Sequence, residues 1–468
     1  MTFPFRRIIV KENRINLIQN KECIPLPFSK KCLPLLLCVC LLALSACGGN
    51  PEPSGPAESS ALGSSLPEGS IEESSTASSA EPSEPEENIP LSYTFTEEEL
   101  LPGGQLAMDE STSVADFSDM IEFDLSAEFP DARCCDLSGE NLSNSMDKLL
   151  YTQFDSKTVW PDSLPEGFDP QQIIDQNRNP GLGVRSLHEQ GITGKGINIG
   201  IVDQPLLIGH VEYKDRLKMY KELNTLDYEL CASMHGPGVA SIALGGTVGV
   251  APEANLYYVS HDFGKSGENM APFIEGLTYL LDLNELLPEE DKLDVITISR
   301  GWTSDLPGAA EMESLIDRAK EEGIFVVTVA IKENYSMDFM GTSRDPLSNP
   351  DDRSAYRPGT FFADDYERSP SDFQEFLMVP MDFRATASPT GTEDYVNYVN
   401  GGLSWATPYL AGVYALAKQV KPDITPEEFY TLAMETSSDI PYTDRFGKEY
   451  TLYNLIDPPA LIAALQNQ

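Results

Sequence analysis

Three residues of the types that carry out acyl transfer occur far apart in the chain: Asp203, His235 and Ser404. A serine hydroxyl becomes a good nucleophile when a neighbouring imidazole accepts its proton, and a carboxylate holds that imidazole in the required tautomer. Singly, each residue has a common structural role, as a turn residue, a structural histidine or a helix N-cap. Together they predict a nucleophile, Ser404, a general base, His235, and an orienting carboxylate, Asp203.

The elements expected to position these residues alternate in type. This pattern indicates an α/β fold, with a doubly wound, mostly parallel sheet and helices on both faces. Asp203 follows a β-rich run, at the edge where such sheets bind ligands, and His235 and Ser404 each begin an apolar helical segment. The helix starting at Ser404 would direct backbone N–H groups at an oxyanion. The expected strands are 197–202, 255–260, 293–299 and 324–331, and the expected helices are 270–287, 309–322, 404–420 and a last one, 426–435, capped by Thr425.

Four short motifs surround these residues: Gly194-Lys195-Gly196, His210-Val211-Glu212-Tyr213, Gly249-Val250-Ala251-Pro252, and Ser404 with Ala406-Thr407-Pro408. They resemble the motifs of one known family, the subtilisin-like serine proteases (subtilases), over about residues 186–440. The resemblance implies a serine endopeptidase that hydrolyses peptide bonds of a peptide or protein substrate through an acyl-enzyme, with His210 in a structural role.

Several positions depart from the family pattern. Gln204-Pro205 follows Asp203, Pro237-Gly238 replaces the usual Thr-His, and Leu403 and Trp405 replace the usual Thr and Met around the serine. The family also places an oxyanion-binding asparagine after the strand at 324–331.

A simple register puts Lys332 at the position of that asparagine, and Asn334, our candidate oxyanion donor, fits only with an insertion. Loss of such a donor lowers the rate roughly a hundred- to a thousandfold. The alternative to a protease is therefore a catalytically weak or inactive surface protein that keeps the fold and binds peptides.

The resemblance also implies a substrate-binding segment, Ser299-Arg300-Gly301, which an extended peptide would pair with. Two roles for Arg300 stay open: binding an acidic substrate side chain, or pairing with an internal carboxylate. Residues 333–375 are polar and rich in turn residues, and we expect a long irregular loop there. Its Asp345, Asp351 and Asp352 match no known calcium-loop spacing, so we expect a solvated loop, with calcium as the alternative. No metal or other cofactor is expected to be required.

The N-terminal region has the features of an export signal. Lys30 and Lys31 precede an apolar run, 33–44, which is too short to span a bilayer comfortably. The run ends in Leu-Ser-Ala-Cys, which resembles the bacterial lipoprotein box and implies lipid attachment at Cys47; an ordinary secretory signal is the alternative. We expect a protein lipid-anchored at the bacterial cell surface, divided into a signal peptide with an N-terminal extension (1–46), a disordered Ser/Pro/Glu-rich stalk (47–95), an extension of unknown fold (96–185) and a peptidase domain (186–468).

The net charge of the chain is −42. Such a charge repels phosphate backbones, so we expect no nucleic-acid partner. It is typical of a solvated surface, with a preference for basic substrates as the alternative. Beyond the leader, Cys134, Cys135 and Cys231 have no zinc-site spacing and form either one disulfide and a free thiol or three thiols. The oligomeric state has no signal in the sequence.

Overall fold

The computed structural model describes residues 92–96, 108–109, 113–223, 232–261, 269–444 and 446–468. The expected signal peptide with Cys47, most of the expected stalk, and Cys231 lie outside these residues. Among the residues that the structure describes, no helix is both long and apolar enough to cross a membrane.

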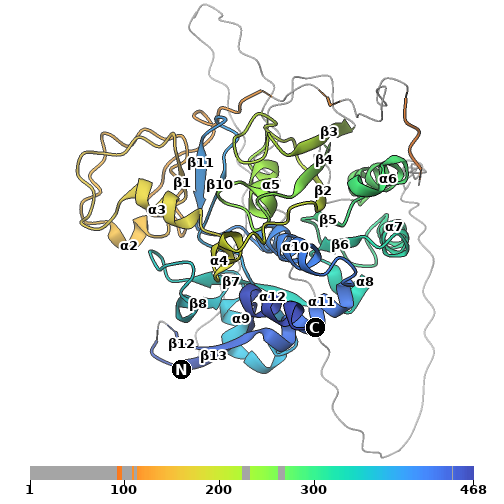
Figure 1. Ribbon diagram of the computed structural model, residues 1–468. Coiled ribbons are helices and arrows are strands. Elements are labelled where there is room, and N and C mark those ends of the chain that lie inside the picture. Colours follow the sequence, from red (N-terminus) through yellow and green to blue (C-terminus); the bar gives the residue numbers. More distant parts are fainter. Residues whose placement is uncertain (1–91, 97–107, 110–112, 224–231, 262–268, 445) are drawn as a thin grey trace, which may run out of the picture.

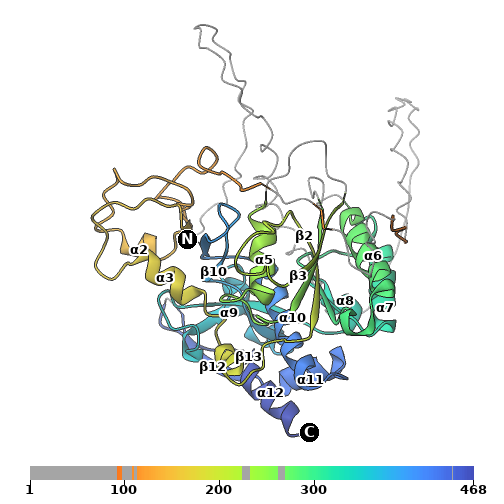
Figure 2. The same ribbon diagram turned by 45° about the horizontal axis from the view of Figure 1, so that its top comes forward.

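A five-stranded parallel sheet forms the centre of the molecule, with the strand order β3-β4-β2-β5-β6. Helices α5 (His235–Leu244) and α10 (Leu403–Val420) pack on one face, and α6 (Ala271–Leu286) and α7 (Ala309–Glu321) cover the other (Figures 1 and 2). Because both faces are covered, every residue of β2 is buried. The doubly wound α/β prediction is confirmed. The strands are β2 (Asn198–Asp203), β3 (Leu217–Leu223), β4 (Asn255–His261), β5 (Val295–Ile298) and β6 (Phe325–Thr328).

The strands of this sheet all end at the same edge. Asp203 is the last residue of β2 and lies level with Ser260 of β4. Ser299 follows β5, and Val329 follows β6. The carboxyl ends of parallel strands thus bring these segments together, as expected for a ligand-binding edge.

A second sheet lies beyond α10, with the order β12-β13-β9-β7-β8. Part of it comes from residues 333–375, so our expectation of one long irregular loop there is wrong. The segment contains elements too short to give a clear periodicity, and turn residues separate them. They are β7 (Phe339–Arg344), β8 (Tyr356–Pro358) and α9 (Ala363–Arg368), and the sheet is completed by β9 (Leu377–Pro380), β12 (Ser438–Thr443) and β13 (Glu449–Leu455).

The C-terminal helices follow their capping residues. Helix α11 (Pro426–Thr436) begins as predicted, and the Thr425 side chain accepts a hydrogen bond from the Glu428 N–H. It is not the last helix, because α12 (Pro458–Gln466) follows. The Asp457 side chain caps α12 by accepting from the Ala460 N–H, so an N-cap followed by proline marks both helices.

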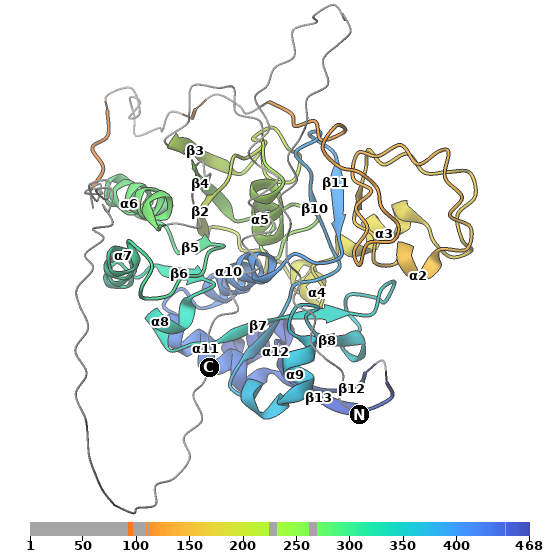
Figure 3. The same ribbon diagram turned by 180° about the vertical axis from the view of Figure 1, so that it is seen from behind.

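Residues 113–183 form a lobe, here called the N-terminal lobe, beside the hairpin of β10 (Arg384–Ala387) and β11 (Tyr395–Tyr398) (Figure 3). Its strand β1 (Phe154–Asp155) pairs antiparallel with β11, with Phe154 opposite Asn397. Its apolar cluster includes Val248, Ala385 and Tyr395 from outside the lobe. The lobe contains α2 (Met146–Leu149) and α3 (Pro170–Asn177), and α4 (Val184–Glu189) leads from it across the boundary drawn at residue 186.

Candidate active site

The side chains of Asp203 and His235 meet at the carboxyl edge of the central sheet. The Nδ1 atom of His235 lies 2.6 Å from Oδ1 of Asp203, whose side chain is 4% exposed. The same oxygen accepts a hydrogen bond of 2.7 Å from the Gln204 N–H. A buried carboxylate bound to Nδ1 holds the imidazole with its proton there, which leaves Nε2 to act as a base.

The close packing of α5 on β2 brings His235 to this carboxylate. A Cβ atom on Gly236 would lie 2.4 Å from the Gln204 carbonyl oxygen and 2.5 Å from the Tyr258 hydroxyl, so a larger residue does not fit. The Ser233 hydroxyl accepts hydrogen bonds from the N–H groups of His235 and Gly236 at 3.2 and 3.0 Å. Ser233 therefore caps the first turn of α5, a role that our sequence analysis missed although serine is a common capping residue.

Ser404 lies in the first turn of α10, directly after a sharp backbone turn. Gly402 adopts φ 62° and ψ −177°, a conformation essentially restricted to glycine. This turn presents Ser404 at the start of the helix, where the first backbone N–H groups generally lack an i−4 partner. The Trp405 N–H donates to the Gly402 carbonyl at 3.1 Å. Ser404 is partly exposed. No hydrogen bond joins its Oγ to His235 among the described residues, and such contacts are often loose in the absence of substrate.

A proline in α10 links Ser404 to the predicted substrate-binding segment. Pro408 lies four residues after Ser404 and has no N–H to donate to the Ser404 carbonyl. The Ser299 hydroxyl donates to that carbonyl instead, at 3.1 Å. The segment 299–301 thus lies beside the candidate nucleophile. The proline at this spacing was visible in the sequence, but the identity of its substitute donor was not.

Trp405 packs against His235, with 5.3 Å between the two ring centroids. Its indole occupies space that two glycines leave open. A Cβ atom added to Gly238 would lie 2.9 Å from the indole Cη2, and one added to Gly401 would lie 2.1 Å from the indole Cδ1. Gly238 and Trp405, which both depart from the family pattern, are therefore coupled: the indole fits only because position 238 has no side chain.

The expected oxyanion asparagine has no counterpart in the geometry. The strand predicted to run to Ile331 ends at Thr328, and the chain forms α8 (Ile331–Tyr335). The Lys332 ammonium group binds Asp338 at 2.5 Å, and its side chain is 65% exposed. The side-chain nitrogen of Asn334, the candidate donor, is closed off from solvent and has no hydrogen-bond partner among the residues that the structure describes. It is not accessible to a substrate oxygen in this structure.

The remaining predicted substrate-binding residues lie next to β6. The Arg300 carbonyl accepts a hydrogen bond of 3.0 Å from the Val329 N–H, and Gly301 lies against the Val329 side chain. Arg300 is 5% exposed, and its guanidinium lies over the Phe273 ring with 5.9 Å to the centroid. It forms no ion pair in the part of the chain that the structure describes, so the internal carboxylate that we left open is not observed.

The aspartates considered for calcium bind separate partners. Asp345 pairs with Arg357, and Asp351 accepts hydrogen bonds from Asn179 Nδ2 and the Gly183 N–H, each at 2.8 Å. Asp352 caps a short turn by accepting from Ser354. Across the described ranges, no group of three or more metal-ligating side chains is present. Cys134 and Cys135 are free thiols.

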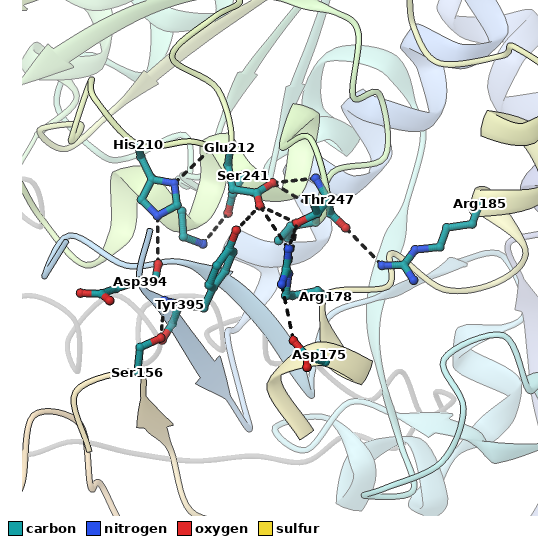
Figure 4. Close-up of polar contacts among 12 residues, drawn as sticks. Ser156, Asp175, Arg178, Arg185, His210, Glu212, Ser241, Thr247, Asp394 and Tyr395 are labelled. Carbon is teal, nitrogen blue, oxygen red and sulfur yellow. Dashed lines mark hydrogen bonds and ion pairs between the residues drawn. The ribbon is translucent and has the colours of Figure 1, made fainter. Parts of the chain in front are cut away.

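A buried carboxylate joins the N-terminal lobe to the central domain (Figure 4). Glu212 accepts hydrogen bonds from the Thr247 N–H at 2.8 Å and from the Tyr395 hydroxyl at 2.5 Å. Burial opposes its charge, but these donors outweigh that cost and lower the pKa of Glu212. Arg178 of the lobe donates to Thr247 Oγ1 and lies 4.3 Å from the Tyr395 ring centroid. Nearby, His210 is fully buried and binds the Asp394 carbonyl, as expected for a structural histidine.

Comparison with known proteins relates this chain to one family. Residues 194–352 match the model of the subtilase family, a range that contains Asp203 and His235 but not Ser404. The chain is 29% identical over 178 residues to the major intracellular serine protease of Bacillus subtilis (strain 168), covering 35% of this chain and 52% of that protein. It is 26% identical over 265 residues to the extracellular serine proteinase of Thermus sp. (strain Rt41A), covering 56% of this chain and 60% of that protein. The chain thus spans between half and two thirds of the length of these relatives.

Among solved structures, the prenylagaramide maturation protease PagA aligns with 18% identity and a TM-score of 0.41, covering 61% of this chain and 99% of that one.

Proposed function

We propose that this chain, a divergent subtilisin-like relative of the subtilase family, is a surface-anchored serine endopeptidase. The observation that carries the proposal is the Asp203–His235 hydrogen bond of 2.6 Å, next to the glycine turn that presents Ser404. The contact of Trp405, the neighbour of Ser404, with the His235 ring supports their proximity.

The proposed reaction proceeds in two halves. Ser404 Oγ attacks the scissile carbonyl carbon while His235 Nε2 accepts the hydroxyl proton, and Asp203 stabilises the imidazolium that forms. The tetrahedral intermediate collapses as His235 returns the proton to the leaving amine, which leaves an acyl-enzyme on Ser404. Water then attacks the ester while His235 accepts its proton, and His235 returns that proton to Ser404 Oγ as the second tetrahedral intermediate collapses and releases the acid product. Backbone N–H groups at the start of α10 are the candidate oxyanion donors.

The geometry after β6 supports a slow enzyme. It also supports one second candidate, a peptide-binding protein without catalysis. The observations behind this alternative are the engagement of Lys332 with Asp338 and the enclosed amide of Asn334. Loss of one oxyanion donor lowers the rate roughly a hundred- to a thousandfold, so a slow peptidase is expected rather than an inert one.

The location and partners are also proposals. The Leu-Ser-Ala-Cys motif supports lipid attachment at Cys47, export, and tethering to the bacterial membrane through the stalk. The net charge of −42 supports the absence of a nucleic-acid partner. The substrate is a peptide or protein, and no cofactor is proposed, although calcium stays an alternative from the family resemblance.

A fluorophosphonate probe, which reacts with activated serines, tests the peptidase proposal. The full chain should be labelled, and Ser404→Ala and His235→Ala should each remove the labelling, with circular dichroism showing that the variants are folded. Thr407→Ser, a conservative change in the same helix, serves as the control and should keep it. Absence of Ser404-dependent labelling in folded protein would leave the peptide-binding alternative.

A further inference from the structure

The segment 299–301 holds Arg300 in a fixed position close to Ser404. The Ser299 hydroxyl binds the Ser404 carbonyl at 3.1 Å. The Arg300 N–H donates to the Ile298 carbonyl at 2.7 Å, and its own carbonyl accepts from Val329 at 3.0 Å. The backbone on both sides of Arg300 is therefore anchored beside the segment that carries the candidate nucleophile, which fixes the point from which its side chain extends.

The Arg300 guanidinium is buried without a counter-charge. The residue is 5% exposed and makes no side-chain hydrogen bond or ion pair in the described structure. Two other arginines have strong partners: the partly exposed Arg353 binds the Asp457 carboxylate, and the buried Arg344 donates to several carbonyl oxygens. The buried Arg384 resembles Arg300 more closely, because it makes one hydrogen bond of 3.4 Å, to the Pro180 carbonyl, in the described structure. Burial lowers the pKa of Arg300, and no carboxylate of the described residues offsets it. The nearby Glu275, on the same helix as Phe273, binds His261 at 2.9 Å.

A buried guanidinium with no partner is unfavourable, because the charge loses its hydration and gains nothing in return. Its Nε has no hydrogen-bond partner among the described residues and is shut off from solvent, whereas neither terminal nitrogen is enclosed and unpaired in this way. Those nitrogens form the edge that binds a carboxylate through two parallel hydrogen bonds. An acidic side chain of a bound peptide would supply the missing partner.

We propose that Arg300 is a specificity-determining residue, which binds the carboxylate of an aspartate or glutamate side chain in a peptide lying along residues 299–301. This inference rests on the proposed peptidase function, and it names the substrate class of that site. It runs against the preference for basic substrates that the net charge of −42 alone suggests, because a local buried cation outweighs distant, screened surface charges.

The test uses quenched-fluorescent peptides that differ at one position only, carrying glutamate, glutamine or lysine, with that position moved along the peptide. For the full chain we expect kcat/KM for glutamate to exceed that for glutamine about ten- to a hundredfold at one position, from a charge-assisted hydrogen-bond pair. Arg300→Leu should bring the ratio to within about twofold, and Arg300→Glu should favour lysine. Equal cleavage of all three series, or a glutamate preference that survives in Arg300→Leu, overturns the inference while leaving the peptidase proposal intact.

Binding separates failure of this inference from failure of the peptidase proposal. Fluorescein-labelled versions of the same peptides are titrated into Ser404→Ala and into Ser404→Ala/Arg300→Leu, with fluorescence anisotropy as the readout. Tighter glutamate binding that the second change removes supports Arg300 even if no peptide is cleaved.

Thermal unfolding then tests for an unseen structural role. Arg300→Leu and Arg300→Gln should melt close to the parent chain, because the contact that they lose is the long one to the Phe273 ring, 5.9 Å from the guanidinium. A large drop in melting temperature in both variants shows that Arg300 has an internal partner and contradicts the inference.

Discussion

The Trp405 indole lies beside His235 in space that Gly238 leaves free, so a side chain at position 238 would collide with it. A substitution that normally stabilises a helix is therefore predicted to destabilise this one. Alanine normally stabilises a helix interior by about 1 kcal/mol relative to glycine. In α5, Gly238→Ala should instead destabilise the chain by about 1–2 kcal/mol, because its Cβ would meet the indole Cη2 at 2.9 Å and overpacking outweighs the gain. In a Trp405→Met background the same change should be neutral or stabilising. Chemical unfolding followed by circular dichroism measures both, and additive effects in the two backgrounds would contradict the coupling.

A second prediction concerns Asp382, a buried carboxyl group near the glycine turn before Ser404. Thr360 donates to Oδ2 through its N–H at 2.8 Å and its hydroxyl at 2.7 Å. Burial raises the pKa of Asp382 to about 6, although Thr360, the Ser343 hydroxyl and the Gly401 N–H favour the charged form. Because the folded-state pKa lies above the unfolded value, the folded chain gains stability at low pH, and it loses about 3 kcal/mol as pH rises from about 4 to above 6.

Asp382→Asn removes this titration. Relative to the parent chain, its free energy of unfolding should therefore rise by about 3 kcal/mol between pH 4 and pH 7. Urea titrations at both pH values measure the difference, with Asp364→Asn, an exposed position on α9, as the matched control. A difference that does not change with pH would show that Asp382 titrates like an exposed aspartate. The sequence has no signal for this residue, because its character comes from burial between segments distant along the chain.

At the scale of elements, the position where β6 ends determines the direction of the Lys332 side chain. The strand stops at Thr328 and α8 begins at Ile331, so position 332 lies in a helical turn with its side chain directed to Asp338. Placing an asparagine there by Lys332→Asn should therefore change kcat/KM by less than about twofold. An asparagine in the oxyanion geometry would instead raise it about a hundred- to a thousandfold. Lys332→Ala is the control, and a rise with asparagine but not with alanine would contradict our interpretation of α8.

The boundary between β6 and α8 also shows which features could not be predicted from the sequence. The strand β2 and the helices α5 and α10 were predictable because each is a strongly apolar run flanked by glycine, so Asp203, His235 and Ser404 could be assigned to their ends. The residues Val329-Ala330-Ile331 are equally apolar in a strand and at the start of a helix, and periodicity over three residues does not distinguish the two. The contacts of Arg300 and Trp405 depend on residues far apart in sequence, which no local pattern contains.

At the scale of the whole molecule, the N-terminal lobe is connected to the candidate active site through strand pairing and shared packing. Its strand β1 pairs with β11, which ends six residues before Ser404. Its apolar cluster shares Ala385 and Tyr395 with the β10–β11 hairpin. Arg178 of the lobe donates to Thr247, which in turn binds the buried Glu212. A segment held in this way is expected to unfold together with the rest of the chain, unlike a propeptide that is removed after folding.

Phe154→Ala tests this integration. Phe154 is 1% exposed and packs against Trp160 and Phe168, with ring centroids 5.3 and 6.1 Å away, so its truncation should cost about 3–5 kcal/mol. If the lobe and the central domain form one cooperative unit, the variant should melt in a single transition at a lower temperature, and fluorophosphonate labelling of Ser404 should disappear at that same temperature. Val159→Ala, at a position 48% exposed in the same lobe, should change neither. Two separate transitions, with labelling retained after the first, would contradict this integration. They would show that β11 holds the turn before Ser404 without its partner strand β1, so that the candidate active site does not depend on the lobe.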